Sequence, residues 1–272
     1  MNRGLQLIRM AAGARREDDL DLDPDAAAYI TAVETADGQA LEAGVKAAIN
    51  SFVVGCKADE IWTAIKTSCI LAGARTLAGA LTPLAGSAPT NTSGNFVADD
   101  YSRTGGLKGN RADKSLNTNI KANTYGTTNH HLAVYTTAAN SVADETAFYA
   151  GGVVSFFIGH HVGITSSDHF YRSWRSAGTM GPASSTTGFF GLRRNNSTDF
   201  QWRGETTTGT VTSDSDNAST DIYLFARQRD GTGLTNFTDA RISFYSAGDS
   251  LDLSLLRSRV GTLITGINTA LS

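Results

Sequence analysis

The segment Ala240–Leu271 reads ARISFYSAGDSLDLSLLRSRVGTLITGINTAL, and its hydrophobic period changes part-way along. At first, Ile242 and Phe244 alternate with Arg241, Ser243 and Tyr245, which are expected to face outward. This is the two-residue period of a strand with one buried face. A turn follows, with Asp249 or Ser250 as the N-cap of a helix. The next apolar residues recur every three or four positions and predict an amphipathic helix: Leu253, Leu256, Val260, Leu263, Ile264, Ile267 and Leu271.

Upstream of this segment, residues 95–246 contain no helical period. Short apolar runs alternate with clusters of Gly, Asn, Asp and Ser at spacings of about ten to fifteen residues. The clearest runs are His131–Thr136 and Asp221–Arg227, and a turn at Arg194–Ser197 joins two runs that could form a hairpin. Because no helices separate these runs, the pattern predicts a mainly β protein built as an antiparallel jelly-roll sandwich.

The N-terminal part predicts helices instead. Asp23 and Pro24 are suited to the N-cap and first position of a helix, and a second helical period follows over residues 41–53. A third short helix is expected to carry Ile61, Trp62 and Ile65. We therefore expect an arm or linker over 1–23, a helical subdomain over 24–66, the sandwich over 67–250 and a C-terminal helix over 251–272. The helical subdomain is small for independent folding, so we expect the C-terminal helix to pack on it as one helical base.

Composition narrows the class of protein. The 272 residues are 40% hydrophobic and 18% charged, with a net charge of -3, so a sizeable core is expected and no basic surface indicates nucleic-acid binding. The two cysteines, Cys56 and Cys69, fit no metal or redox motif and are interpreted as buried free thiols. No apolar run is long enough to span a membrane, and the first ten residues lack the apolar core of a signal peptide.

Three further segments suggest a family. They are NSFVVGCKADEIW over Asn50–Trp62, CILAGA over Cys69–Ala74 and GGLKGNRADKSLNTN over Gly105–Asn119. With the closing strand and helix, they resemble the laminin-G-like, concanavalin-like jelly-roll domains that recur in structural proteins of tailed bacteriophages and prophages. The resemblance covers residues 23–271. Arg111 stands where that family usually has glycine, and Asn117 where it usually has aspartate.

The resemblance implies a non-enzymatic virion structural protein, associated with the tail or a fibre and used for assembly or host-surface contact. Such a protein is made in the host cytoplasm and released by lysis. Its partners would be other virion proteins, further copies of itself, with a trimer favoured, and a host glycan; no cofactor is expected. The alternatives are a capsid-surface decoration protein and a stand-alone lectin-like or hydrolytic module. In a trimer, Leu5, Leu7 and Ile8 would make the assembly contact around the axis.

The residues suggest few sites for catalysis or metal binding. Five histidines occur at positions 130, 131, 160, 161 and 169, but neighbours on a strand point to opposite faces, so structural roles are favoured over a metal site that would include Asp168. Asp199 and Glu205 are the nearest pair for glycoside hydrolysis, and the only candidate calcium loop is residues 214–217. Neither is favoured over an ordinary surface role.

Aromatic residues offer candidate platforms for a sugar ring, although most aromatic side chains of a sandwich fill its core. Tyr171 and Trp174 lie in a segment bounded by Ser, Gly and Asp, and Arg172 and Arg175 beside them could bind acidic sugars. These four residues are therefore the candidate glycan contacts.

Overall fold

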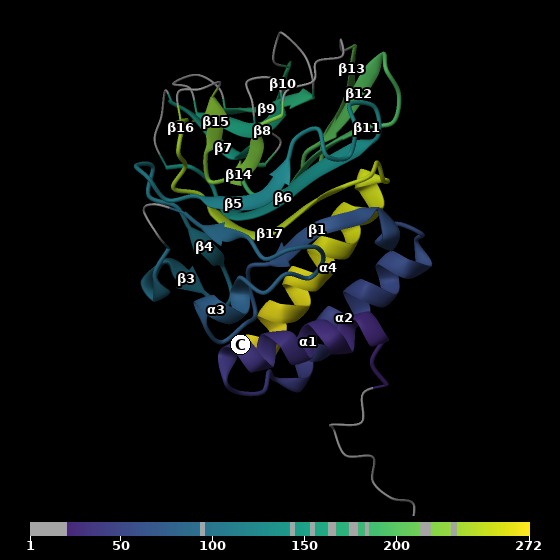
Figure 1. Ribbon diagram of the computed structural model, residues 1–272, viewed down its shortest axis with the longest axis vertical. Helices are drawn as coiled ribbons and strands as arrows, with labels where there is room; N and C mark the ends of the chain where they lie inside the picture. The colour runs from purple at the N-terminus through teal and green to yellow at the C-terminus, as the bar shows by residue number, and fades with distance from the viewer. Residues whose placement is uncertain are drawn as a thin grey trace, which may run out of the picture.

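The computed structural model describes residues 21–92, 96–141, 145–152, 156–162, 167–173, 179–182, 185–212, 219–229 and 233–272. It has three layers: a group of helices, a central sheet, and a second sheet on the far side of the central one (Figure 1). The predicted mainly β, antiparallel architecture with a C-terminal helix is confirmed. The assembly contact expected at Leu5, Leu7 and Ile8 lies outside the described residues.

The central sheet has the strand order β13-β12-β11-β6-β17-β4-β3, and β1 also pairs with β17. Its strands are β1 (Ile65–Ile70), β3 (Tyr101–Ser102), β4 (Gly106–Lys108), β6 (His130–Ala138), β11 (Gly188–Arg194), β12 (Asp199–Arg203), β13 (Thr208–Thr212) and β17 (Arg241–Gly248).

The second sheet has the order β10-β9-β8-β7-β14-β5-β2, and β15 (Arg227–Arg229) and β16 (Gly233–Thr235) form a separate hairpin. The strands of the second sheet are β2 (Thr90–Asn91), β5 (Leu116–Lys121), β7 (Glu145–Gly151), β8 (Phe156–Val162), β9 (Ser167–Ser173), β10 (Thr179–Pro182) and β14 (Asp221–Leu224).

Strand β17 lies at the centre of the first sheet and is buried along nearly its whole length. It pairs with β6 on one edge and with β4 and β1 on the other. The prediction of one buried face is wrong, because the strand is buried on both faces, by the helices on one side and by the second sheet on the other. Ile242 and Tyr245 enter the core between the sheets, whereas Phe244 packs on the helices. The register between β17 and β6 shifts between Ile242 and Phe244, and this irregularity breaks the simple alternation.

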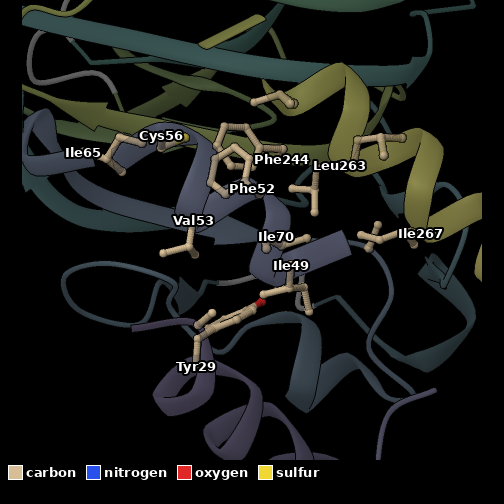
Figure 2. Close-up of a cluster of buried hydrophobic side chains, with 14 of the residues drawn as sticks. Tyr29, Ile49, Phe52, Val53, Cys56, Ile65, Ile70, Phe244, Leu263 and Ile267 are labelled. Atoms are coloured by element: carbon tan, nitrogen blue, oxygen red, sulfur yellow. The ribbon is translucent and has the colours of Figure 1, made fainter. Parts of the chain in front are cut away.

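The helical layer is built on two antiparallel helices, α2 (Ala43–Ala58) and α4 (Leu253–Leu271). They approach closely at small residues: a Cβ on Gly44 would lie 2.7 Å from that of Ala270. Figure 2 shows their side chains meeting the sheet. The rings of Phe52 and Phe244 are in edge contact, with their centroids 5.7 Å apart. The C-terminal helix therefore packs along α2. The buried residues of α4 are those predicted from the spacing, except that Leu271 is partly exposed.

The helix ends follow the capping rules, with two differences from the predictions. Helix α1 (Pro24–Asp37) begins at the predicted Asp23 cap. The cap of α4 is Asp252, which accepts from two backbone N–H groups, rather than Asp249 or Ser250. The third N-terminal helix is only a 3₁₀ turn, Trp62–Ala64, that leads into β1. The remaining short helical pieces are α3 (Leu77–Ala80) and a 3₁₀ turn at Ala98–Asp100.

Charged side chains fix the helices to one another and to the central sheet. Arg259 of α4 forms two hydrogen bonds, of 2.7 and 2.8 Å, with Asp59 at the end of α2. Arg103, after β3, binds both carboxylate oxygens of Glu42 at the start of α2. Each pair is planar and charge-assisted, so it fixes orientation as well as position.

The turn between β4 and β5 places position 111 in a conformation that suits glycine. Arg111 has a φ of 61°, which is a left-handed conformation that glycine adopts more readily than arginine. Asn110 stabilises the turn because its Oδ1 accepts from the backbone N–H groups of the three residues 112–114. Asn117 of β5 donates to Asp221 of β14.

Both cysteines are buried free thiols, as predicted. Burial raises the pKa of the Cys56 and Cys69 thiols to about 12. Within the described ranges, no helix has both the length and the hydrophobicity to cross a membrane.

Phe244→Ala tests whether the contact between β17 and the helices is central to stability. Removing a fully buried ring should lower the free energy of unfolding by about 3–5 kcal/mol. The control is Val97→Ala, whose side chain is 53% exposed and should change stability by about 0.5 kcal/mol or less. Urea denaturation measures both, and equal losses in the two variants would contradict this view of the core.

Candidate functional site

The predicted glycan contacts do not form an exposed cluster in the described structure. Tyr171 is only 1% exposed, and its ring stacks on Trp202 at 4.8 Å with an interplanar angle of 16°. It is a core residue of the sandwich, so its ring cannot receive a sugar in this conformation. Arg172 is partly buried on the same strand. Trp174 and Arg175 lie outside the described residues.

The two histidines of β6 are structural. His131 donates from Nδ1 to the carbonyl of Asp249 at 2.6 Å and accepts at Nε2 from the hydroxyl of Ser246 at 3.0 Å. His130 is held in the same way by Gly126 and Ser173. Both rings are buried and neutral, and burial lowers the pKa of His130 to about 3 and that of His131 to about 4. Since each Nε2 lone pair already accepts a hydrogen bond, neither ring is available to a metal.

The other metal candidates give no further site. The side chains of His160, His161, His169 and Asp168 are outside the described residues, as are residues 214–217 of the candidate calcium loop. In the part of the chain that is described, no three His, Cys, Asp or Glu side chains are grouped as metal ligands.

The carboxylate pair considered for glycoside hydrolysis does not come together. Asp199 begins β12 and Glu205 follows its end, and the strand between them is itself about 13 Å long at the usual rise per residue. The two carboxylates of a glycosidase stand about 5–10 Å apart. Glu205 instead accepts a hydrogen bond from the backbone N–H of Phe189 at 2.8 Å.

Glu205 contributes to a groove that we call the α4 groove, which has a volume of about 550 Å³. One wall comes from the central sheet, where Tyr135 of β6 and Glu205 after β12 lie. The other is one face of α4. The complete lining is Tyr135, Glu205, Arg257, Ser258, Gly261, Thr262, Thr265 and Gly266.

The polar groups of the α4 groove are held in place. Arg257 forms an ion pair with one oxygen of Glu205, and the side chains are 36% and 22% exposed respectively. The Tyr135 phenol lies near both. Burial, and then the Glu205 carboxylate, raise the pKa of Tyr135, whereas Arg257 lowers it. An aromatic ring, an arginine, a carboxylate and several hydroxyls therefore converge on one hollow.

Gly261 in this groove has no structural explanation. A Cβ built on it would meet no heavy atom within 4 Å, whereas one on Gly266 would lie 3.0 Å from the Cβ of Ala48 on α2. Helix packing therefore explains Gly266 but not Gly261. Glycine within a helix costs about 1 kcal/mol relative to alanine. What Gly261 does provide is open space over the helix backbone.

A second hollow, of about 590 Å³, lies on the helical layer beside Trp62. The Trp62 indole Nε1 donates to Asp25 at 3.0 Å, and the Lys57 amine lies 6.0 Å from the ring centroid. Tyr29, Lys66 and residues 83–86 complete the same wall. This hollow combines an anchored, partly exposed indole with charges of both signs.

Comparisons with known proteins identify the fold without naming a family. No protein-family model matches the sequence, and no curated protein matches it. Among solved structures, a mutant Trypanosoma rangeli sialidase displaying trans-sialidase activity matches with a TM-score of 0.50 and 10% identity, over 79% of this chain and 39% of that one. The botulinum neurotoxin serotype D binding domain matches with a TM-score of 0.48 and 9% identity, over 73% of this chain and 51% of that one. The chain spans less than two thirds of either protein, and the likeness is one of fold.

The buried histidines predict how stability depends on pH. Their folded pKa values lie below the ordinary 6.5, so the unfolded state binds protons first as the pH falls. Their contribution is fully present above about pH 6.5 and is lost as the pH falls toward their folded values, at about 1.4 kcal/mol per pH unit for each histidine.

His131→Gln should therefore reduce the slope of unfolding free energy against pH between 6.5 and 5 by about 1.4 kcal/mol per unit. Urea denaturation at several pH values measures this difference, whatever the variant costs at neutral pH. An unchanged slope would show that His131 binds protons equally in the folded and unfolded states over this pH range, and so that burial does not lower its pKa.

Proposed function

We propose that this chain is a non-enzymatic structural protein of a tailed-bacteriophage virion, associated with the tail or a fibre, that contacts host-surface carbohydrate through the α4 groove. The groove is the observation that carries the proposal. A sugar presents an apolar ring face and several hydroxyls, and protein sites for it combine an aromatic side chain with a few fixed polar groups. Tyr135, the Glu205–Arg257 pair and the hydroxyls of α4 supply this combination.

The virion assignment is supported by the sequence motifs that resemble phage structural proteins. The structure adds a physical reason for their form, since the turn at Arg111 adopts the conformation for which that family uses glycine. The sandwich fold that this chain shares with a sialidase is compatible with carbohydrate contact and does not require catalysis. Glu205 is committed to Arg257 and Phe189 rather than to an acid–base pair.

The helical layer would attach the protein to the particle. Trp62 is suited to this role because anchored tryptophans are among the residues that contribute most to protein interfaces. Homo-oligomerisation as a trimer, with Leu5, Leu7 and Ile8 at the axis, remains part of the proposal. A capsid-surface decoration protein is the second candidate, and it would bind isolated capsid shells at icosahedral positions.

A glycan array tests the carbohydrate contact, with Gly261→Leu as the blocking variant. The Cβ of the leucine would meet no heavy atom within 4 Å, and leucine is the better helix former by about 1 kcal/mol, but its side chain occupies space in the groove. We expect at least a tenfold loss of glycan binding with no loss of thermal stability. The control, Ala36→Leu, places the same side chain on the exposed face of α1 and should bind as the wild type does. Equal binding by all three proteins would exclude the α4 groove.

The virion assignment is tested by the position of the protein in intact particles. Labelled antibody and cryo-electron microscopy should place it on the tail or a fibre, and sedimentation of the purified chain should give the mass of a trimer. A uniform distribution over the capsid surface would favour the decoration protein, and a stable monomer would contradict the trimeric form.

A further inference from the structure

We infer that the α4 groove selects neutral saccharides and that Glu205 excludes sugars that carry a carboxylate. This rests on the proposed function and specifies its ligand. The first observation is the charge of the lining. Only Glu205 and Arg257 are charged among the lining residues, and they pair with each other, so the groove has no net charge. The other polar lining groups are hydroxyls, which can donate or accept a hydrogen bond.

The second observation is that the Glu205 carboxylate is fixed. One oxygen accepts from the backbone N–H of Phe189, and the other meets Arg257. The carboxylate also fills the space beside Gly188, which has a φ of 106° and whose Cβ would lie 2.5 Å from Glu205 Oε2. Arg257 is therefore already neutralised by a carboxylate that has a backbone partner of its own and does not have to leave.

These two facts distinguish the classes of sugar. An acidic sugar that reached Arg257 would bring its carboxylate next to that of Glu205, and like charges at such short range repel strongly in a partly buried site. A neutral sugar meets no such repulsion. Its neighbouring hydroxyls can donate to Glu205 and accept from Arg257, which are stronger hydrogen bonds than neutral ones.

The shape of the groove at Gly261 supports the same conclusion. Its missing side chain leaves open space on the face of α4 that lines the groove, between the hydroxyl-bearing residues Ser258 and Thr262. A flat ring could approach the helix there without displacing any side chain. The structure thus assigns Gly261 as the position that admits the ring and Glu205 as the position that determines its charge.

The test is an array of paired glycans that share a core and differ by one terminal residue, either neutral or carboxylate-bearing. The full chain and its Glu205→Gln and Gly261→Leu variants are compared, with melting temperatures measured on the same samples. The wild type should bind the neutral member at least tenfold more tightly. Glu205→Gln keeps an oxygen for the Phe189 N–H but removes the charge, so this ratio should fall at least tenfold as acidic glycans gain affinity.

The outcomes separate this inference from the proposed function. Preference of the wild type for the acidic members, or an unchanged ratio in Glu205→Gln, would overturn the inference, while a loss of all binding in Gly261→Leu would still support the groove. Binding that survives Gly261→Leu would overturn both, as would no binding to any glycan. If Glu205→Gln has a lowered melting temperature, Arg257→Gln replaces it in the test. The Glu205 carboxylate then lacks its ion-pair partner, so neutral sugars should bind more weakly and acidic sugars should still be excluded.

Discussion

The burial of β17 on both faces is the constraint on which the rest of the structure depends. A strand with one solvent-exposed face needs only a second sheet to cover its other face. Phe244 and Tyr245, however, point to opposite sides of β17, and both are fully buried. Two serines of the strand have internal partners, since Ser246 binds His131 and Ser243 donates to the carbonyl of Tyr135. Each face therefore requires its own apolar cover. The helices complete the core of the sheet rather than decorate it.

The same constraint creates the α4 groove. Helix α4 packs against β11 and β12 of the central sheet, and one wall of the groove belongs to the sheet and the other to the helix. The Glu205–Arg257 pair then spans the two layers. Because Arg259 also binds Asp59 on α2, the helix is fixed to both of its neighbours. Little ordering would be needed when a ligand enters a site whose walls are already held in this way.

Much of the architecture could be predicted from hydrophobic period, and much of the site could not. The change of period at residues 247–252 gives the strand, the turn and the buried face of α4 directly. The orientation of Phe244 could not be predicted, because it depends on a local shift of register. Alternation around Tyr171 indicates a strand but does not say which side meets the core. Tyr135, Glu205 and Arg257 are far apart in the sequence, so no local pattern brings them together. Gly261 is the exception, because a glycine within a strong helical period is visible in the sequence itself.

Gly261 also bears on how such a protein could diversify. Every codon for glycine becomes a codon for alanine or valine by one nucleotide change, and a Cβ added to this residue would meet no heavy atom within 4 Å. Most residues that face a ligand also contribute to the stability of the fold, so many of their substitutions are lost because the protein misfolds, whatever their effect on binding. At Gly261, in contrast, a substitution could change which ligands bind without changing the stability of the fold. Under the proposed function, a lineage could narrow, lose or recover its receptor range there while the layers beneath stay unchanged.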